Sequence, residues 1–454
     1  MAPRIPDQSD LTSRDSFSTH ERIKAANLFD ESLESSKEEL KSTTAFKDYY
    51  AKRITGLSGF SSLKRGDTSY AELFKADSED NKTIKGELAK ALEFTPLNQK
   101  RYNKLNSDLK SLGDRMKSGQ SWPPGAVASY LADTKAKSEK VLQAQHAEEE
   151  KNIKNLFTQP QFVNALKTSL HLENDTQVDD IKNDMLNHLK KGQEERVQEF
   201  QKSINDDITQ KKEEARKEFE RVSYFAQAFL RKGVMQDEIN RIAHEKNPLD
   251  EEVLTTNQQG ISAHLKGIEV NDLKKLETIR GTEISKNGDS YSVKIDGPKM
   301  LFSWPWPLSA LAEDAILKDL TSLAMTIKAS GAKGITMNVH HSDPKKAEEL
   351  ARHSYEACID AGFPPEAITI QVNGETKVSP KGKNQEAKNE LFNNHPHRLQ
   401  KLKKKAATIA EDAKAQVDEN SASNKAGAAQ IKKELKQGRT AANNPIPPSN
   451  APKP

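Results

Sequence analysis

Apolar residues recur at steps of three and four through the first third of the chain, among many charged positions. Leu109, Leu112 and Met116 form one such stripe. Because an α-helix turns once in about 3.6 residues, this spacing places them on one face of a helix. The apolar stripe is narrow and the charged face is wide, which predicts a helical bundle over residues 18–157. Residues 1–17, rich in Ser, Asp and Pro, are predicted to be a disordered lead-in.

A longer helical pattern follows over residues 158–247. Its apolar positions again step by three or four residues, with one step of seven: Val197, Phe200, Ile204, Ile208, Ala215, Phe219, Val222, Ala226 and Phe229. The mean step lies between that of a heptad seam and that of a straight amphipathic helix. Two interpretations stay open. Either this long helix packs in its own bundle, or residues 176–246 form a coiled-coil arm for self-association or for binding a helix of a host protein.

Further along the chain, the period of the apolar positions changes to two, which predicts a small α/β domain over residues 255–378. Asn287 and Gly288 form the dipeptide typical of a two-residue type I′ turn, between two stretches of alternating apolar residues. The expected β-hairpin places Ile284 opposite Tyr291.

Three short apolar strands are expected after the hairpin, at residues 300–304, 335–340 and 368–372, with helices over 308–327 and 344–361 between them. Crossovers of this length favour a parallel βαβαβ sheet, with the hairpin added at its edge. The predicted fold class is therefore α+β multidomain: an N-terminal helical bundle with a long amphipathic helix, then a small α/β domain and a disordered tail.

The C-terminal part is the basic part of the chain. From residue 375 onwards, sixteen Lys and Arg residues stand against eight Asp and Glu residues. A basic helical arm is predicted over residues 379–435. Residues 436–454 are predicted to be a disordered tail, because five prolines lie among residues 445–454.

Composition narrows the class of protein. Only 34% of the 454 residues are hydrophobic, and the formal net charge is +3, so the whole chain has no electrostatic preference for nucleic acid or membrane. The single cysteine, Cys358, excludes an intramolecular disulfide and a multi-cysteine zinc site, and no cofactor or metal is predicted. With no apolar run of about 18 residues and no secretory signal pattern, we expect a soluble protein without a transmembrane segment.

A phosphate or anionic ligand is the first candidate chemistry. His340, His341, Ser342, Lys345 and Lys346 fall at the end of the middle predicted strand and in the first turn of the next helix. In an open parallel sheet, ligands bind beyond the carboxyl ends of the strands, where helix N-termini present free N–H groups. The alternative interpretation is an ordinary N-cap with solvated lysines, since the chain has neither a P-loop nor a dinucleotide-binding motif.

Two further features have both a functional and a structural interpretation. Trp304 and Trp306, in a Trp-Pro-Trp-Pro sequence, either line an aromatic groove or cover a core. Cys358 shares an apolar helical stripe with Leu350 and Ala361, which indicates packing rather than a catalytic nucleophile. No complete set of acid, base and nucleophile is visible, so an enzyme is not favoured.

The densest positive patch spans residues 398–405, with Arg398, Lys401, Lys403, Lys404 and Lys405. Anionic membrane and nucleic acid are both physically reasonable partners. The third possibility is a solvated basic helix with no partner.

Residues 315–372 resemble small domains associated with large polyvalent and conjugative-relaxase proteins, through Gly331–Met337, Lys346–Ala351 and Ala361–Phe363. That resemblance implies no catalytic residues. The layout of a charged helical front, one α/β module and a polar tail resembles Dot/Icm-type type IV secretion effectors of intracellular bacterial pathogens.

The effector resemblance implies secretion into the host cytoplasm and interaction there with a host protein or a membrane surface. The alternative is a nucleic-acid-associated accessory protein of the bacterial cytoplasm, using the α/β domain and the basic arm.

Overall fold

The computed structural model describes residues 40, 64–65 and 68–443, except for 76, 121, 231–236, 240, 243–244, 246–268, 289, 296–306, 381–386 and 419. The described residues from 213 to 421 form one compact unit, and those from 40 to 212 together with 422–443 form another. Most of them are helical and the sheets are small, so the protein is of the α+β class. The predicted lead-in and most of the predicted tail lie outside the described residues.

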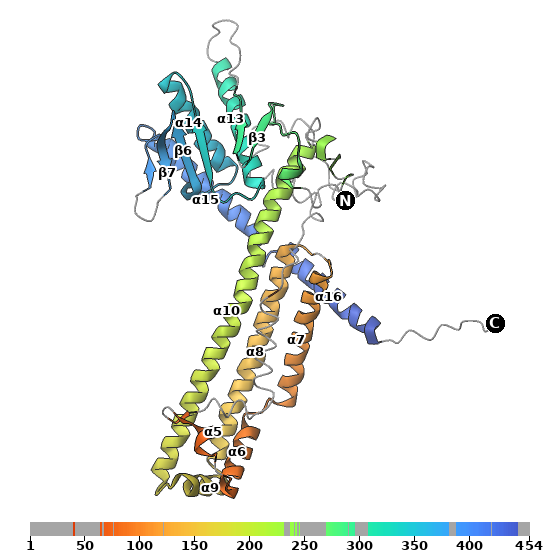
Figure 1. Cartoon of the computed structure of the whole chain (residues 1–454), viewed down its shortest axis with the longest axis vertical. Helices are drawn as coiled ribbons and strands as arrows, with labels where there is room; N and C mark the ends of the chain where they lie inside the picture. Colours follow the sequence, from red (N-terminus) through yellow and green to blue (C-terminus); the bar gives the residue numbers. More distant parts are fainter. Residues whose placement is uncertain are drawn as a thin grey trace, which may run out of the picture. The chain divides into compact units, whose positions relative to one another are not determined.

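The helical unit consists mainly of helices, and three of those described, α7, α8 and α9, begin at a proline. Its elements are β1 (Lys64–Arg65), β2 (Thr68–Ser69), α5 (Tyr70–Leu73), α6 (Glu79–Ala91), α7 (Pro96–Lys117), α8 (Pro124–Leu156), α9 (Pro160–Leu170), the first part of α10 (Asp175–Leu230) and α16 (Ala422–Asn443). Proline suits the first helical position because its missing N–H has no partner there anyway. Figure 1 shows α7, α8 and the first part of α10 side by side, with α5, α6 and α9 gathered at one end.

Two apolar clusters form the core of the helical unit. One joins α5, α6, α9 and the start of α10 through Tyr70, Phe74, Leu88, Phe162 and Met185. The other joins α7, α8, α10 and α16. Phe200, Ile204 and Ile208 of the long stripe are buried in this second cluster, so this part of the stripe packs inside the chain rather than facing a partner.

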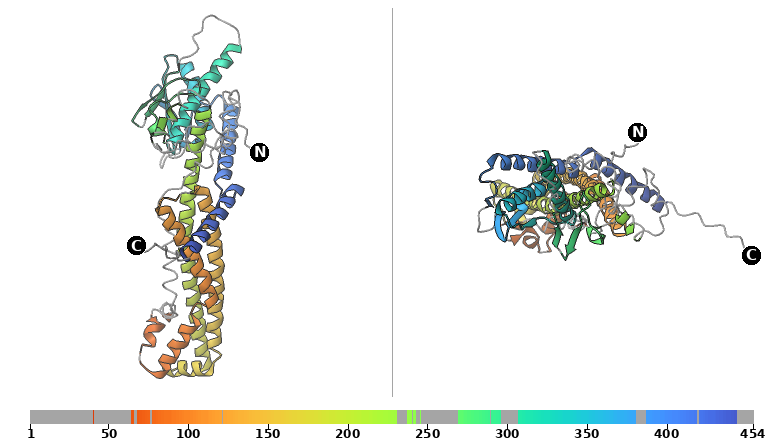
Figure 2. Two further views of the ribbon diagram at one scale, coloured as in Figure 1. Left: turned by 90° about the vertical axis from the view of Figure 1, so that its right-hand side faces the viewer. Right: turned by 90° about the horizontal axis from the view of Figure 1, so that it is seen from above.

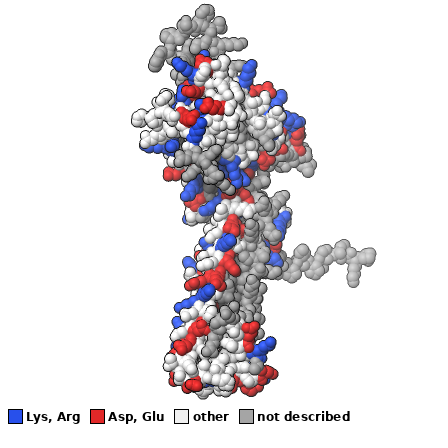
Figure 3. Space-filling model, turned by 60° about the vertical axis from the view of Figure 1, so that its left-hand side comes forward, with Lys and Arg blue, Asp and Glu red and all other residues white. Residues whose placement is uncertain are grey.

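Charged side chains cover the outer surface of the helices. On the face that Figure 3 displays, positive and negative side chains are interspersed along the helical unit. Many are ion pairs one turn apart, such as Lys90–Glu87 at 2.8 Å and Lys82–Glu79 at 3.1 Å. Each such exposed pair stabilises a helix by only about 0.3–0.5 kcal/mol, so the apolar clusters carry most of the stability.

The last helix, α16, lies against α8 (Figure 2). Its Ile431 and Leu435 are buried in the core of the helical unit, and its Glu434 accepts a hydrogen bond from Trp122 Nε1 at 2.9 Å. The prediction of one basic arm over residues 379–435 is therefore wrong. The apolar face of α16 is used to complete the helical unit, whereas the preceding helix belongs to the α/β unit.

The second unit contains the last part of α10 and an α/β arrangement. Its elements are η4 (Val270–Asp272), β3 (Ile284–Asn287), β4 (Ser290–Val293), α13 (Pro307–Ala329), β5 (Ile335–Val339), α14 (Pro344–Asp360), η5 (Pro365–Ala367), β6 (Ile368–Val372), β7 (Glu375–Ser379), β8 (Lys388–Asn389) and α15 (Pro396–Val417). The described strands β5 to β8 form a sheet in the order β5-β6-β7-β8, in which β5 and β6 are parallel and the other pairs antiparallel.

One face of this sheet is covered by α14. Along β5, Ile335, Met337 and Val339 are buried whereas Thr336 and Asn338 are exposed, as the period of two requires for a sheet packed on one side. The helix α13 packs beside α14 and against β4. The end of α10 joins the same core, where Tyr224 Oη lies 3.1 Å from Thr326 Oγ1 of α13.

The β-hairpin differs from the prediction in two respects. It pairs Ile284 with Val293 and Asn287 with Ser290, so the connection begins at Gly288, whose φ is +60°, rather than at Asn287. The expected pairing of Ile284 with Tyr291 is wrong by two residues. The hairpin also forms its own two-stranded sheet instead of hydrogen-bonding to the edge of the larger sheet.

Two strands, β7 and β8, were not expected. Asn373 and Gly374 both have positive φ, which is the geometry of a type I′ turn, and they turn the chain from β6 directly into β7. The expected strand at residues 300–304 lies outside the described residues. No described helix is long and apolar enough to cross a membrane.

Candidate functional site

The predicted phosphate site lies where β5 ends and α14 begins. The N-cap residue of α14 is Asp343, whose Oδ1 accepts hydrogen bonds from the backbone N–H groups of Lys345 at 2.9 Å and Lys346 at 3.5 Å. His341 Nδ1 accepts the backbone N–H of Asp343 at 2.9 Å. An incoming phosphate needs the same helix N-terminal N–H groups and would meet a carboxylate there.

The side chains named for this site do not converge. Ser342, Lys345 and Lys346 are exposed. The backbone N–H of His341 donates to Asn373 Oδ1, and Asn373 Nδ2 donates to the His341 carbonyl, both at 3.1 Å. This reciprocal pair ties the end of β5 to the end of β6. The arrangement therefore favours the structural interpretation, in which Asp343 caps the helix and the hydrogen bonds between His341 and Asn373 join the ends of the two strands.

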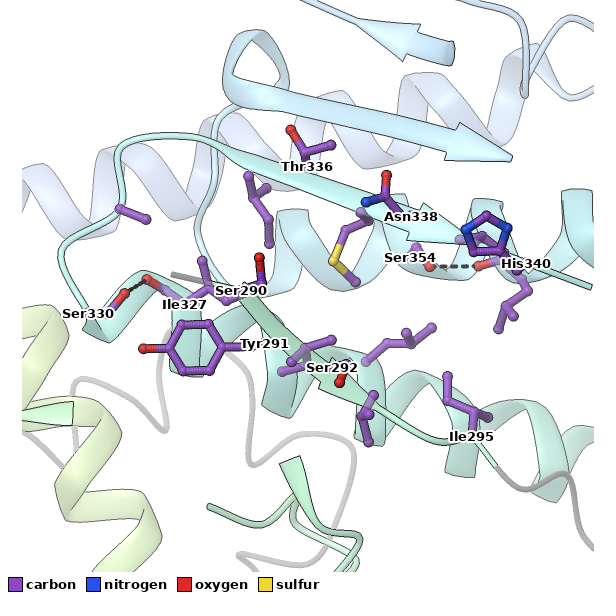
Figure 4. Close-up of a pocket in the computed structure, with 18 of the residues that line it drawn as sticks. Ser290, Tyr291, Ser292, Ile295, Ile327, Ser330, Thr336, Asn338, His340 and Ser354 are labelled. Atoms are coloured by element: carbon purple, nitrogen blue, oxygen red, sulfur yellow. Dashed lines mark hydrogen bonds between the residues drawn. The ribbon is translucent and has the colours of Figure 1, made fainter. Parts of the chain in front are cut away.

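A groove of about 1090 Å³ lies on the other side of β5. Its walls are the strands β4 and β5, and its floor is formed by α13 with part of α14 (Figure 4). The wall residues include 290–295 of the hairpin and 334–341 around β5. His340 and Ile295 lie at the same end of the groove, where both strands finish.

On the side of β5 that faces this groove, no other described strand is paired with it. Among the described strands, β5 has β6 as its only partner. The N–H of Asn373 donates to the Val339 carbonyl at 2.8 Å, so Val339 directs its backbone groups toward the β6 side. The two backbone groups of a residue point to one edge of a strand and successive residues alternate. Thr336 and Asn338 therefore direct their N–H and C=O groups toward the groove.

The opposite wall, β4, also directs backbone groups away from its hairpin partner. Asn287 and Ser290 close the hairpin as a hydrogen-bonded pair, and alternation from that pair turns the backbone groups of Tyr291 and Val293 away from β3. Two strand edges thus flank the groove. Its floor is apolar, with Leu320, Leu323, Ile327 and Leu350 lining it.

The described lining residues of the groove include basic but no acidic side chains. None of its described lining residues is Asp or Glu, whereas Lys294, His340 and His341 line it. Sequence reasoning had named His340 and His341 but missed the groove and its β4 wall. The pattern predicts which segments are strands, but which strand has a free edge depends on how the hairpin and the sheet pack.

The predicted basic patch is divided by its contacts. Arg398 donates to Glu349 at 2.9 Å and to Glu356 at 3.2 Å, and Lys405 pairs with Asp360. These bonds hold α15 against α14, and Leu402 is buried in the same contact. The remaining patch residues, Lys401, Lys403 and Lys404, are exposed. The apolar face of α15 is thus already covered, whereas Lys401, Lys403 and Lys404 face solvent.

Cys358 is fully buried in the core of the α/β unit. Burial, with a smaller contribution from the Asp360 charge, raises the pKa of its thiol far above the ordinary value. A thiolate is the nucleophilic form of cysteine, so this residue serves packing. Trp304 and Trp306, the predicted aromatic groove, lie outside the described residues.

A second, more open cleft of about 610 Å³ lies between α8 and α10 in the helical unit. Its charged side chains include the ion pair of Lys190 with Glu150 at 3.7 Å. It offers neither a strand edge nor an apolar floor. Among the described residues, no group of three His, Cys, Asp or Glu side chains is placed to hold a metal ion.

Comparison with known proteins adds no family to this geometry. No protein-family model matches the chain, and neither the curated proteins nor the solved structures contain a significant match.

Proposed function

We propose that this protein acts by binding another polypeptide, with the groove between β4 and β5 as the contact surface. One observation carries the proposal: the edge of β5 that pairs with no other described strand lies beside an apolar floor. An exposed strand edge is a template for pairing with another chain, and proteins commonly cover or charge such edges. Here the edge residues Thr336 and Asn338 are neutral.

The test is selection of binding peptides from a random displayed library on the full chain. We expect sequences enriched on the wild-type protein to be lost on Ser292→Trp, which places a large side chain in the groove. The matched control is Ser285→Trp. Ser285 pairs directly with Ser292 across the hairpin but does not line the groove. Enrichment that is equal on both variants would place the binding surface elsewhere and contradict the proposal.

In the effector class that the layout resembles, the bound polypeptide would be a host protein. Delivery of a reporter fusion into host cells from a secretion-competent bacterium tests this part separately. The structure defines which truncation to use. Since β7, β8, α15 and α16 are packed elements, only residues 444–454, which follow α16, are removed. Delivery that requires these residues would support the effector role, and no delivery of the full fusion would contradict it.

A nucleic-acid-associated role is the second candidate, and the exposed Lys401, Lys403 and Lys404 favour it. Phosphate contacts release counterions, so binding through them would weaken steeply with salt. The measurement is a salt titration of DNA and RNA binding to the full chain. Replacing the three lysines by glutamine is expected to reduce the slope if they contact phosphates, and an unchanged slope would dismiss the patch.

A further inference from the structure

We infer that Asn373 is a site of spontaneous covalent modification that the fold protects, and that the protection ends when the end of β5 separates from the end of β6. The modification is deamidation, in which an asparagine side chain loses ammonia after attack by the next backbone nitrogen. The inference concerns the α/β unit alone and is independent of the proposed function.

Deamidation is fastest where glycine follows the asparagine, because glycine has no Cβ atom to hinder the reaction. The glycine nitrogen attacks the asparagine Cγ atom, so that a C–N bond forms. The Cγ–Nδ2 bond breaks, and ammonia leaves with the proton of the glycine N–H. Water then opens the resulting succinimide at one of its two carbonyl groups, which gives aspartate or isoaspartate. Water is the only co-reactant, and neither an oxidant nor an enzyme is needed.

The sequence contains two Asn-Gly pairs, and each lies at a turn between strands of the α/β unit. Asn287 is the last residue of β3 and is followed by Gly288, whose φ is +60°. Asn373 directly follows β6, and with a φ of +50° it occupies the first central position of the turn into β7. Both asparagines are exposed, so access of water does not distinguish them.

Three hydrogen bonds hold Asn373 to the end of β5. Its backbone N–H donates to the Val339 carbonyl at 2.8 Å. Its Oδ1 accepts the backbone N–H of His341, and its Nδ2 donates to the His341 carbonyl, both at 3.1 Å. The side-chain amide is therefore bound through its oxygen atom and through its nitrogen atom.

This reciprocal pair opposes the reaction directly. During attack, the planar amide becomes tetrahedral at Cγ, and Nδ2 becomes the leaving group. Asn373 must therefore release His341 before the ring can close. The described contacts of Asn287 are those of its backbone, which pairs with Ser290 across the turn. We thus expect the fold to slow the reaction much more at Asn373 than at Asn287.

Modification of Asn373 would weaken the link between the two strand ends. In the aspartate product, an oxygen atom replaces the Nδ2 donor and faces the His341 carbonyl, so one hydrogen bond is lost. The isoaspartate product also adds a methylene group to the backbone within the turn. Since His341 lines the groove beside β5, the wall of the groove would change as well.

The test compares the two pairs within one protein. The full chain is incubated at neutral pH, both in its native state and in guanidinium chloride. Samples are digested in mild acid with a protease that cuts after glutamate, which places the two asparagines on separate peptides. Replacement of NH2 by OH raises the mass of a peptide, so mass spectrometry measures each rate. A sample digested without incubation corrects for conversion during the digest.

The quantity of interest is the ratio of the unfolded rate to the native rate at each site, because it cancels the intrinsic reactivity of each pair. We expect this ratio to be at least tenfold larger at Asn373 than at Asn287. Asn373 reacts only during the fraction of time in which the strand ends are apart, and such local opening is rare in a packed sheet.

Two variants at one position locate the protection. His341→Pro removes the backbone N–H that donates to Asn373 Oδ1 and is expected to raise the native rate at Asn373 at least threefold. His341→Ala is the matched control. It loses the Nδ1 bond to the backbone of Asp343 but keeps both backbone groups that bind Asn373, so the rate should stay near that of the wild type.

A product mimic tests the consequence and does not depend on the proline variant. Asn373→Asp is expected to speed hydrogen exchange of the backbone N–H of residue 373, which donates to Val339, at least threefold. Asn287→Asp, the same change at the other turn, should leave this exchange rate unchanged.

Three results would overturn the inference. Equal ratios at the two sites would mean that the bonds to β5 give no protection. Equal acceleration by His341→Pro and His341→Ala would assign the protection to the His341 side chain instead of its backbone. Absence of conversion at Asn373 in guanidinium chloride would remove the site itself. None of these results bears on peptide binding in the groove, so the proposed function stands or fails separately.

Discussion

A Cβ atom on Gly427 of α16 would lie 2.6 Å from the Cβ atom of Ala126 of α8, closer than real side chains approach. At Gly125, a Cβ atom would meet the side chain of Asn424 at 2.4 Å. The two helices therefore cross at Gly427, where α16 cannot carry a larger residue without a shift of α8, whereas the Asn424 side chain beside Gly125 is able to move. Close helix contact of this kind explains why α16 packs on α8 despite its low content of large apolar residues.

We expect Gly427→Ala to destabilise the helical unit, although alanine favours helix formation. Overpacking of a tight contact typically costs about 1–3 kcal/mol, more than the gain of about 1 kcal/mol in helix propensity. The measurement is urea unfolding followed by Trp122 fluorescence, with Trp304 and Trp306 replaced by phenylalanine. Gly86→Ala in α6 is the control, because nothing lies within 4 Å of its added Cβ and it should stabilise. A stabilising Gly427→Ala would contradict the crossing geometry.

A buried carboxylate in the helical unit supports a second prediction. Glu149 of α8 is 1% exposed and accepts hydrogen bonds from Gln193 Nε2 at 2.7 Å and Gln145 Nε2 at 3.3 Å. Removing one donor from a buried acceptor costs about 1–3 kcal/mol. Gln193→Ala should therefore lower the free energy of unfolding by that amount. Gln198→Ala, an exposed position on the same helix, should change it by less than about 0.5 kcal/mol.

A third prediction concerns acid and the docking of α15. Burial alone would raise the pKa of Glu349, but hydrogen bonds from Arg398 and Arg352 outweigh it, and the pKa lies below its ordinary value of 4.5. A carboxyl group whose pKa is lowered by folding stabilises the protein above its unfolded pKa. That contribution is lost as the pH falls through the lower, folded value.

Glu349→Gln should accordingly lower the free energy of unfolding at pH 7 by less than about 1 kcal/mol, because the side chain is partly exposed. The difference between the two proteins should shrink as the pH falls below 4.5, as unfolding titrations at several pH values would measure. Arg398→Met also removes the bond to Glu356 and should cost more at pH 7. A difference for Glu349→Gln that grows in acid would have the wrong sign for this linkage.

The fourth prediction uses the single thiol of the chain. Cys358 is fully buried with a raised pKa, so a thiol reagent should modify it only when the α/β unit opens. We expect labelling at pH 8 to be at least a hundredfold slower in the native protein than in guanidinium chloride. Rapid native labelling would show that the core around α14 opens readily.

Local patterns predicted most of the regular elements. The limits of α14 and the parallel strands β5 and β6 follow from caps and alternation, and their parallel pairing is confirmed. The Asn373-Gly374 dipeptide is typical of a turn that leads into another strand. The alternation of apolar and polar residues after it is too short for β7 to be predicted from the sequence. The hairpin register depended on which residue occupies the first left-handed position, and Gly288 adopts it more readily than Asn287.

The groove could not be predicted from the sequence for a different reason. His340 and His341 were named from their place after a strand, and that place is correct. Whether β3 and β4 join the larger sheet or leave a gap beside β5 is a matter of packing on α13, through residues far apart in the chain. The same holds for Asp343, whose occupation of the anion position depends on the orientation of its side chain.

The helical unit is discontinuous in sequence, since residues 213–421, which begin with the last part of α10, separate the first part of α10 from α16. During synthesis on the ribosome, the α/β unit is complete before Ile431 and Leu435 have been made. Part of the core of the nascent helical unit therefore stays uncovered until α16 has been synthesised. A chain arrested shortly before residue 422 would expose the surface of α8 to chaperones, and the vulnerability of newly made protein to proteolysis should be concentrated in that interval.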